Sequence, residues 1–243
     1  MIFNLPDKCA EFLHIYFFIG DDILYRTESL FDFSKSTAGE YLIKFKYPWQ
    51  ALPGIKELII NIGTRLDKKE YEEILPSVWV HRTAVIAPTA FIGSVCIIGQ
   101  ESDVRHGAFI RGSALVGSEC VVGNSVELKN VVLFDKVQVP HYNYVGDSIL
   151  GYKSHMGAGA ITSNVKSDKS LVTVNNNGEK IPTGLKKFGA ILGDYVEVGC
   201  NSVLNPGTVV CSNSNVYPLS SVRGVVPRSS IYKSNGNVVE KYN

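Results

Sequence analysis

The chain has 243 residues, and its 24 Lys and Arg side chains almost balance its 23 Asp and Glu side chains. This balance, without a long run of one sign, argues against a protein that binds nucleic acid or a membrane surface by charge. Hydrophobic residues make up 45% of the chain, enough for a sizeable core, and the five cysteines show no metal-ligand spacing, which indicates reduced thiols in an intracellular protein.

The longest early apolar run, residues 12–19, predicts neither a membrane span nor a signal peptide. His14 interrupts the run, which is far shorter than the roughly 20 residues of a spanning helix. No basic segment precedes it, as a signal peptide would require. We therefore expect a soluble cytoplasmic protein.

Residues 1–76 are predicted to form a small, mainly helical cap on the first turn of the domain that follows. One helix is predicted between Pro53 and Gly63, which mark its ends. Its apolar residues have amphipathic helical spacing: Ile55, Leu58, Ile59 and Ile62. Residues 21–31 and 68–74 are weaker helix candidates.

A period of six residues governs the next part of the chain. Aliphatic residues stand at nine consecutive positions, six residues apart: Val80, Ile86, Ile92, Ile98, Val104, Ile110, Val116, Val122 and Leu128. Small or β-branched residues stand two positions before each of them. This period predicts short strands on the three faces of a prism, with the aliphatic side chains inward. Three hexads make one coil, and successive coils stack as parallel strands about 4.8 Å apart.

The period slips after Leu128 and returns later. The next inward residues are predicted to be Leu133, Val139, Val145, Leu150, Met156 and Ile161, with three of the six intervals being five residues long. Steps of six resume at Leu192 and continue to Val222. The β-helix domain is predicted to cover residues 77–228.

Two hairpins are predicted outside the regular coils. Residues 164–188 would form a loop extruded from the prism, because residues 171–181 alternate around an Asn-Gly pair. Extruded loops of a solenoid commonly carry binding surfaces. The tail, residues 229–243, has a second Asn-Gly signal and is predicted to cover the exposed edge of the last coil.

Four segments carry a resemblance to a known family: FIRGSALVGSECVVGNSVELKN, VPHYNYVGDSILG, GAGAITSN and KKFGAILGDYVEVG. On these segments, residues 104–223 resemble the acetyltransferase domain of the bifunctional sugar-1-phosphate nucleotidyltransferase/acetyltransferases, which are hexapeptide acyltransferases, and the archaeal branch most closely. The resemblance implies an all-β fold, the left-handed parallel β-helix. It also implies a CoA-dependent N-acetyltransferase that acts on an amino-sugar 1-phosphate similar to glucosamine 1-phosphate, works as a homotrimer with sites between subunits, and needs no metal.

The nucleotidyltransferase half of that family is not matched. Its signature glycine-rich loop, followed by arginine and a phosphate-binding lysine, is missing from this sequence. The first 76 residues are also too few for such a domain. We therefore expect no pyrophosphorylase activity from this chain.

Arg111 and Lys129 are candidate phosphate ligands. Each follows an inward aliphatic residue and they are 18 residues apart, so they are predicted to stack on one corner of neighbouring coils. Two neighbouring cations suit a dianion such as a phosphate monoester, and Glu127 beside them would bind a sugar hydroxyl or reduce their repulsion. The alternative is a solvated corner whose cations pair with surface acids. The resemblance implies that the arginine and the lysine bind the sugar phosphate.

His141 is the candidate general base. It stands two residues after the inward Val139, in a coil where the period slips, and Tyr144 follows it. Acetyl transfer to an amine needs a base that takes the proton as the bond forms, and a neutral imidazole suits that task. A backbone N–H within residues 157–164 would stabilise the charge on the thioester oxygen. The alternative is a surface histidine without a function, but the resemblance implies the role of base.

The resemblance implies further site residues. Acetyl-CoA, as co-substrate, would contact Ala158 near its thioester, and further along its channel Asn164, Cys200 and Pro218. The acceptor sugar would contact Tyr144, Asn164, Lys187 and His155. His155 stands where the family has an asparagine, Val165 where its bacterial branch has a tyrosine, and Cys200 and Pro218 where it has small residues, so the acceptor and the coenzyme contacts are open at these positions.

Two other functions stay open from the residues alone. One is a non-catalytic trimeric β-helix that binds a sugar nucleotide or a protein partner. The other is a zinc enzyme, since some hexapeptide proteins are carbonic anhydrases with three histidines around the metal. However, His106 and His141 are predicted two coils apart, about 9.5 Å by strand spacing, which is too far for ligands about 2 Å from one ion. His81 and His155 occupy other hexad positions.

Overall fold

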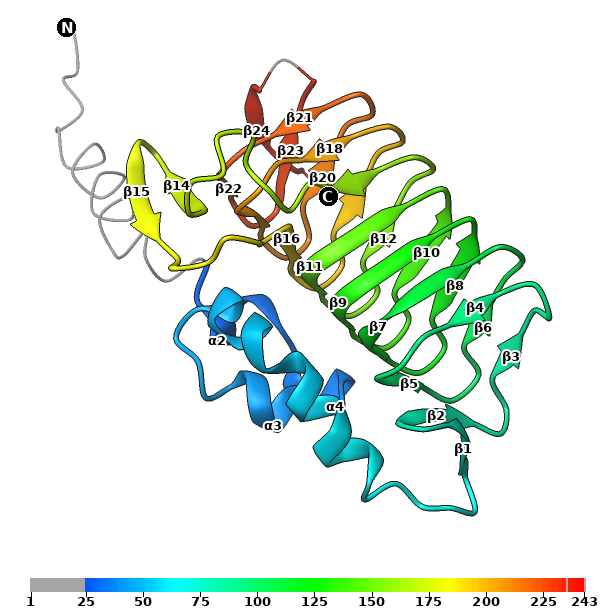
Figure 1. Cartoon of the computed structure of the whole chain (residues 1–243). Coiled ribbons are helices and arrows are strands. Elements are labelled where there is room, and N and C mark those ends of the chain that lie inside the picture. Colours follow the sequence, from blue (N-terminus) through cyan, green and yellow to red (C-terminus); the bar gives the residue numbers. More distant parts are fainter. Residues whose placement is uncertain (1–24, 235, 243) are drawn as a thin grey trace, which may run out of the picture.

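The chain folds into a left-handed parallel β-helix of about nine turns, with short helices along one side (Figure 1). The computed structural model describes residues 25–234 and 236–242. The apolar run at residues 12–19 and the first part of the helix predicted at 21–31 lie outside these ranges. No helix in the described ranges is long and apolar enough to cross a membrane.

Each coil passes over three flat faces, whose strands run parallel to their neighbours. Face 1 contains β2 (Val78–His81), β5 (Cys96–Ile98), the second halves of β7 (Phe109–Val116), β9 (Glu127–Leu133) and β11 (Tyr144–Leu150), then β16 (Ala190–Leu192), β19 (Thr208–Val210) and β22 (Val225–Val226). Face 2 contains β4 (Phe91–Ile92), the first halves of β7, β9 and β11, then β13 (Ile161–Thr162), β18 (Val203–Leu204) and β21 (Ser221–Val222). Face 3 contains β3 (Val85–Ile86), β6 (Asp103–Val104), β8 (Val121–Asn124), β10 (Gln138–His141), β12 (His155–Met156), β17 (Glu197–Val198), β20 (Asn215–Val216) and β23 (Ser230–Tyr232).

The inward rows follow the predicted period, with one correction. The aliphatic residues from Ile98 to Leu128 in steps of six are all fully buried. On β13, however, the inward residue is Thr162, and Ile161 lies half-buried on the outer side. Only two intervals after Leu128 are therefore five residues long, those that end at Leu133 and Leu150.

Face 1 carries a second apolar row, which points outward. These residues align strand by strand and are all buried: Trp79, Ile97, Leu115, Val132, Ile149, Ile191 and Val209. The helix α4 (Ile55–Gly63) and the 3₁₀ helix η2 (Pro48–Gly54) pack on this row. The helix predicted at residues 55–62 is thus confirmed, and its apolar stripe covers the outside of face 1.

The helical segment lies along face 1 and not over the first coil, where it was expected as a cap. It also contains α2 (Thr27–Leu30), η1 (Phe33–Lys35) and α3 (Gly39–Leu42). It reaches the late coils, because the Leu30 carbonyl accepts hydrogen bonds from the Asp194 N–H (3.0 Å) and the Ser212 hydroxyl (2.9 Å). The helix predicted at residues 68–74 is wrong: β1 (Tyr71–Leu75) pairs antiparallel with β2, where it satisfies the backbone edge of the first coil.

Both predicted hairpins are present. β14 (Thr173–Asn176) and β15 (Glu179–Pro182) form the first, which folds back over β19 and β22 and buries Val172 and Val174. Its loop leaves and rejoins the solenoid at one corner, where the Phe188 N–H donates to the Asn164 carbonyl at 3.0 Å. β24 (Val238–Glu240) pairs antiparallel with β23 and covers the last coil.

Candidate functional site

Two corners of the prism hold the residues predicted for the site. The Lys129 corner joins face 2 to face 1 and carries, on successive coils, Arg111, Lys129, Asp147 and Asn164. The His141 corner joins face 3 to face 2 and carries, on successive coils, His141, Ala158, Cys200 and Pro218. The two corners border opposite edges of face 2, on which Glu127 and Tyr144 lie side by side.

The Lys129 corner is shortened in two consecutive coils. Both five-residue intervals cross it, and Asn130 and Asp147 make its turns with φ of +54° and +48°. Asn and Asp tolerate this left-handed conformation better than other residues with a Cβ atom. The shortened intervals of the repeat, which were expected near His141, therefore lie at the Lys129 corner and not at the His141 corner.

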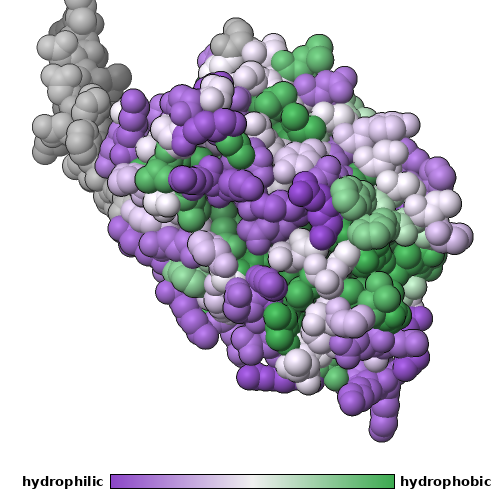
Figure 2. Space-filling view, in the orientation of Figure 1, coloured by the Kyte–Doolittle hydropathy of each residue, from purple (hydrophilic) through white to green (hydrophobic). Residues whose placement is uncertain are grey.

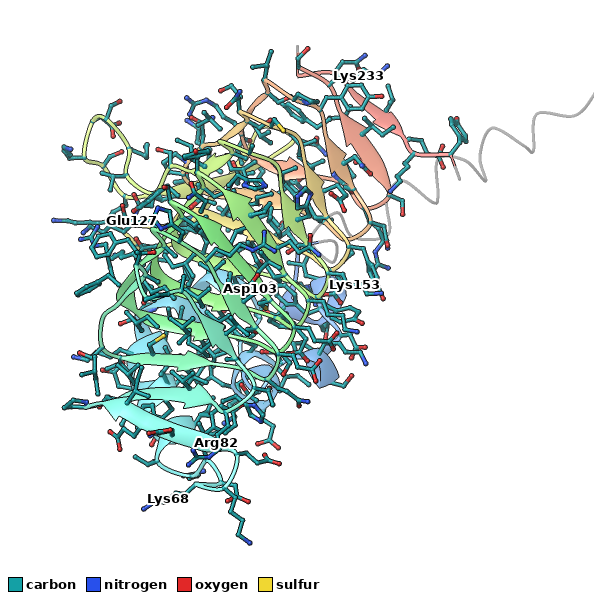
Figure 3. All side chains as sticks on the ribbon, turned by 90° about the vertical axis from the view of Figure 1, so that its right-hand side faces the viewer. Lys68, Arg82, Asp103, Glu127, Lys153 and Lys233 are labelled. Atoms are coloured by element: carbon teal, nitrogen blue, oxygen red, sulfur yellow. The ribbon has the colours of Figure 1, made fainter. Side chains whose placement is uncertain are left out.

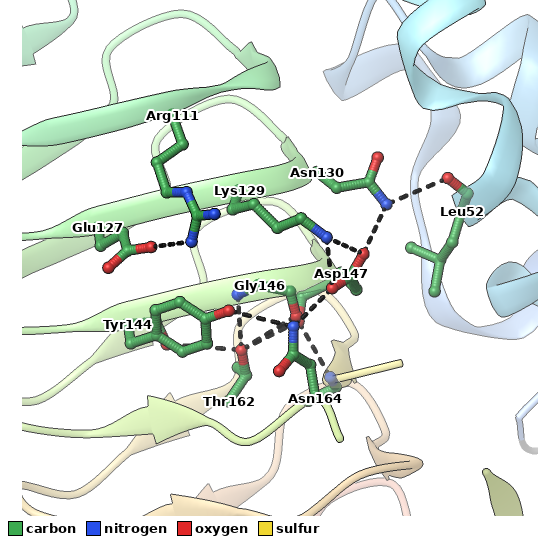
Figure 4. A network of polar contacts seen from close by, with 12 residues as sticks. Leu52, Arg111, Glu127, Lys129, Asn130, Tyr144, Gly146, Asp147, Thr162 and Asn164 are labelled. Carbon is green, nitrogen blue, oxygen red and sulfur yellow. Dashed lines mark hydrogen bonds and ion pairs between the residues drawn. The ribbon is translucent and has the colours of Figure 1, made fainter. Parts of the chain in front are cut away.

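Asp147 is the centre of a polar network at this corner (Figure 4). Lys129 Nζ lies 2.9 Å from its Oδ1 and 3.0 Å from its Oδ2. Asn130 Nδ2 donates to Oδ1 at 2.9 Å and Asn164 Nδ2 donates to Oδ2 at 2.6 Å. Only 6% of the Asp147 side chain is exposed, so these donors replace water around a buried carboxylate.

Tyr144 joins the network through Asn164, whose Nδ2 donates to the phenol oxygen at 3.1 Å. Burial raises the pKa of Tyr144, as do the charges of Asp147 and Glu127, so the phenol keeps its proton at neutral pH. Its hydroxyl is therefore a neutral donor. Below it, the inward Thr162 hydroxyl accepts from the Gly146 N–H at 2.9 Å, which explains how a polar residue is accepted in the inward row.

Arg111 lies in a β-bulge. Ile110 pairs with Leu128, but Gly112 is the next residue to pair, with Lys129, so Arg111 is the extra residue of β7. Gly112 has φ of +124° and a Cβ atom there would collide with the Ser94 carbonyl, so glycine is required. The bulge directs the half-exposed guanidinium to Glu127, whose Oε1 lies 2.8 Å from Nη1.

The charges at this corner balance. Arg111 pairs with Glu127 and Lys129 pairs with Asp147, so two cations face two carboxylates. In the free protein both cations are thus paired with carboxylates, as the alternative interpretation of this corner expected, and Glu127 moderates the charge of Arg111. The hydrogen bond that Arg111 donates to the Glu127 carboxylate is also the main reason that the pKa of Arg111 is raised.

His141 stands apart from this network. Its backbone N–H donates to Asn143 Oδ1 at 3.1 Å, and its backbone carbonyl accepts from the Gly159 N–H at 3.0 Å. Asn143 is buried and its amide donates to the Gly157 and Ala160 carbonyls, at 2.8 and 2.9 Å. The backbone of His141 is thus held firmly, while its exposed side chain makes no hydrogen bond to another described residue.

The residues predicted along the coenzyme follow His141 on the same corner. The Asn201 N–H donates to the Ala158 carbonyl at 2.8 Å, and the Leu219 N–H donates to the Cys200 carbonyl at 3.0 Å. Ala158, Cys200 and Pro218 therefore mark one edge, coil after coil. Asn164, which was predicted to serve both substrates, belongs to the Lys129 corner.

Two predicted acceptor residues are outside the Asp147 network. His155 lies on face 3, where its Nδ1 is 2.8 Å from Glu197 Oε2. In Figure 3, Lys153, two residues before this strand, lies on the opposite side of the solenoid from Glu127. Lys187 is exposed at the return of the loop, next to Phe188.

The zinc alternative gains no support from the histidines. Asn124 occupies the coil between His106 and His141, and its Nδ2 donates to the His106 carbonyl at 3.3 Å. His106 Nδ1 instead contacts Thr89 Oγ1 at 2.7 Å. Within residues 25–234 and 236–242, no three His, Cys, Asp or Glu side chains are grouped to hold a metal ion.

The residues that sequence reasoning missed are Asp147, Asn130 and Thr162. A signal for the first two was available, since each stands inside a five-residue interval of the repeat and is of a type that favours left-handed turns. Thr162 had no such signal, because Ile161 beside it fits an inward row better by hydrophobicity.

Residues 95–222, just over half of the chain, match the family model of the GMPPB C-terminal domain. The bifunctional protein GlmU of Methanococcus vannielii is 32% identical over 155 residues, 63% of this chain and 34% of that protein. The one of Methanococcus maripaludis is 31% identical over 198 residues, 80% of this chain and 48% of that protein. The bifunctional sugar-1-phosphate nucleotidylyltransferase/acetyltransferase of Sulfurisphaera tokodaii is 34% identical over 109 residues, 45% of this chain and 27% of that protein. The chain thus spans less than half the length of each relative.

Solved structures are more distant. The acetyltransferase domain of PglB from Neisseria gonorrhoeae, in complex with acetyl coenzyme A, has 16% identity and a TM-score of 0.30, and the match covers 76% of this chain and 65% of that one. A point mutant of AntD, an N-acyltransferase from Bacillus cereus in complex with dTDP and coenzyme A, has 16% identity and a TM-score of 0.34, with 68% and 81% covered.

Proposed function

Because the chain belongs to the family of the GMPPB C-terminal domain, we propose that it is a sugar acetyltransferase, which moves an acetyl group from acetyl-CoA to the amine of an amino-sugar 1-phosphate. The observation that carries the proposal is the Lys129 corner. Five residues predicted for the acceptor come from four coils and lie at this corner or beside it on face 2, joined by two carboxylates, Glu127 with Arg111 and Asp147 with the rest: Arg111, Glu127, Lys129, Tyr144 and Asn164.

The acceptor would bind through donors that the network leaves available. Arg111 donates one of its five N–H groups to Glu127. The Lys129 ammonium contacts Asp147 on one side only, so its other side can face the acceptor. The Arg111–Glu127 pair is exposed, and such pairs contribute about 1 kcal/mol or less. A phosphate can therefore replace Glu127 on the guanidinium at small cost, which frees that carboxylate for a sugar hydroxyl or amine.

His141 would act as the base. The neutral amine attacks the thioester carbonyl, so that a C–N bond forms while the imidazole takes the amine proton. The C–S bond then breaks, and the CoA thiolate takes a proton from the imidazolium to leave as free CoA. The ring of His141 is exposed and makes no hydrogen bond to another described residue, which suits it to this exchange of protons.

Ala158 would supply the oxyanion contact. The N–H groups of Gly157, Gly159 and Ala160 in the same turn all donate to backbone carbonyls. For the Ala158 N–H no acceptor is found within the described part of the chain. It is the N–H of this turn that is available to the thioester oxygen, on the same corner as His141.

The proposed enzyme is a homotrimer with sites between subunits. Supporting this, His155 on face 3 is separated from the Lys129 corner within one chain, and a neighbouring chain could bring it there. Face 2 also exposes Phe91 (59%) and Phe109 (42%), whose rings are 5.5 Å apart. Figure 2 shows apolar side chains gathered over the strands of the early coils at the right of the view.

The test is an acetyl-CoA turnover assay on a panel of amino-sugar 1-phosphates, in which the free thiol of the released CoA is measured. Turnover on a phosphorylated amino sugar but not on its unphosphorylated form is the expected result. If the pure protein binds no CoA by calorimetry and turns over none of these sugars, the non-catalytic binding module is the better account.

A further inference from the structure

The helical segment touches the polar network at one point. Asn130 Nδ2 donates to the Leu52 carbonyl of η2 at 3.3 Å and to Asp147 Oδ1 at 2.9 Å. Figure 4 shows the amide of Asn130 between the two, with Leu52 on the helical segment and Asp147 on the solenoid. Asn130 of the solenoid thus reaches a residue of the helical segment that is 78 positions away in the sequence.

The same 3₁₀ helix supports the other side of the network. Trp49 of η2 is 1% exposed and its ring is stacked on Phe188, with centroids 5.9 Å apart. The Phe188 N–H donates to the Asn164 carbonyl at 3.0 Å, so this contact fixes the point where the loop rejoins the solenoid. η2 therefore contacts both Asn130 and the residue that anchors Asn164.

Asp147 depends on these contacts because its carboxylate is buried. A buried carboxylate that loses a partner becomes costly, and its remaining partners rearrange to compensate. Its backbone is equally engaged, since the Asp147 carbonyl accepts from the Gly189 N–H at 2.9 Å. A shift of Asn130 would therefore be passed to Lys129 and Asn164, which share the same carboxylate.

We propose that Asp147 is a positioning residue of the acceptor site and that the helical segment sets its geometry through Leu52, Asn130 and Trp49. This inference rests on the proposed function, because the acceptor is the ligand that Lys129 and Tyr144 would bind. Asp147 does not contact the acceptor in this scheme. It holds the ammonium of Lys129 and, through Asn164, the phenol of Tyr144 at fixed places, so acceptor affinity is coupled to docking of the helical segment.

Asn130→Ala tests the coupling, with Asn213→Ala as the matched control. Asn213 also has a left-handed backbone (φ +63°) but lies at the corner between faces 1 and 3, so alanine brings a similar backbone penalty there. We expect Asn130→Ala to raise the acceptor KM about tenfold, the size of one lost hydrogen bond to a charged group, with the acetyl-CoA KM and kcat within about twofold of wild type. Asn213→Ala should leave all three unchanged.

Asp147→Asn keeps the size and tolerates the left-handed turn, but removes the charge that holds Lys129. It should raise the acceptor KM more than Asn130→Ala does, and the double variant should be no worse than Asp147→Asn alone, because both act through one carboxylate. Additive effects, or equal KM values for Asn130→Ala and Asn213→Ala, would overturn the inference.

If Asp147→Asn does not fold, a crystal structure of Asn130→Ala tests whether Asn130 positions Asp147, and no activity measurement is needed. The inference expects Lys129 Nζ or Asn164 Nδ2 to leave hydrogen-bond distance of Asp147, and an unchanged network refutes it. If wild-type protein turns over no amino-sugar phosphate, the proposed function fails, while this structure still decides whether Asn130 positions Asp147.

Discussion

At the scale of single residues, the two corners of face 2 have different tasks. A base acts mainly in the transition state, whereas a phosphate ligand acts already in the ground state. His141 offers an exposed ring on a fixed backbone, and Arg111 offers a guanidinium directed by a bulge. Their replacement should therefore affect different kinetic constants.

His141→Ala should lower kcat by about 10²–10⁴-fold with little change in acceptor KM, since the proton acceptor is lost. Arg111→Ala should mainly raise acceptor KM, because a charge-assisted bond to phosphate is lost. Steady-state kinetics of the two purified variants measures both. Both side chains are exposed, so circular dichroism should show wild-type folds. Full activity in His141→Ala would mean that this histidine has no part in catalysis.

The phenol of Tyr144 should act without titrating. Burial, Asp147 and Glu127 raise its pKa above the usual value of about 10, so it is protonated at every pH below that. Tyr144→Phe should raise acceptor KM about three- to tenfold, for one lost neutral hydrogen bond. The pH profile of kcat/KM between about pH 6 and 9 should keep its shape. A change of that shape would show that the phenol exchanges protons in the reaction.

At the scale of elements, the regular coils were predictable from the sequence and the corners were predictable only in part. Hexads from Ile98 to Leu128 are inward because one aliphatic residue per face fills the prism. Position alone cannot reveal that Thr162 replaces Ile161, since that depends on the hydrogen bond its hydroxyl makes with Gly146. Nor could spacing reveal that Arg111 is bulged, or that Asp147 accepts from three side chains on the two neighbouring coils.

The outward apolar row of face 1 was visible in the sequence but not interpreted. Each of its residues directly precedes an inward one, as Leu115 precedes Val116, and such pairs indicate a face covered on both sides. That row explains why the helical segment lies along the solenoid and not over its end.

Leu115→Ala should destabilise the fold by about 2–5 kcal/mol, because it opens a cavity between face 1 and the helical segment. Phe109→Ala on the same strand is the control. Its ring is 42% exposed within one chain, so the loss of unfolding free energy in a monomeric state should be well below that of Leu115→Ala. Denaturant titration compares the two, and equal losses would contradict this assignment of the faces.

At the scale of the whole molecule, the proposed trimer places face 2 against neighbouring chains. Light scattering at micromolar concentration should give about three times the chain mass of 26.7 kDa. A double replacement, Phe91→Ser with Phe109→Ser, should lower that mass and remove turnover together, while His141 and Arg111 stay intact. A monomeric wild-type protein with full activity would refute sites shared between subunits.

The shortened Lys129 corner has a consequence for how such a scaffold can change. The two five-residue intervals, the bulge at Arg111 and the loop that returns at Phe188 all lie on this one edge, whereas the inward rows continue past it in register. Lengthening or exchanging the chain here alters what projects from the edge without disturbing the stacking of coils. This edge is therefore the natural grafting point for redesigning acceptor choice, with the other two edges left untouched as the frame.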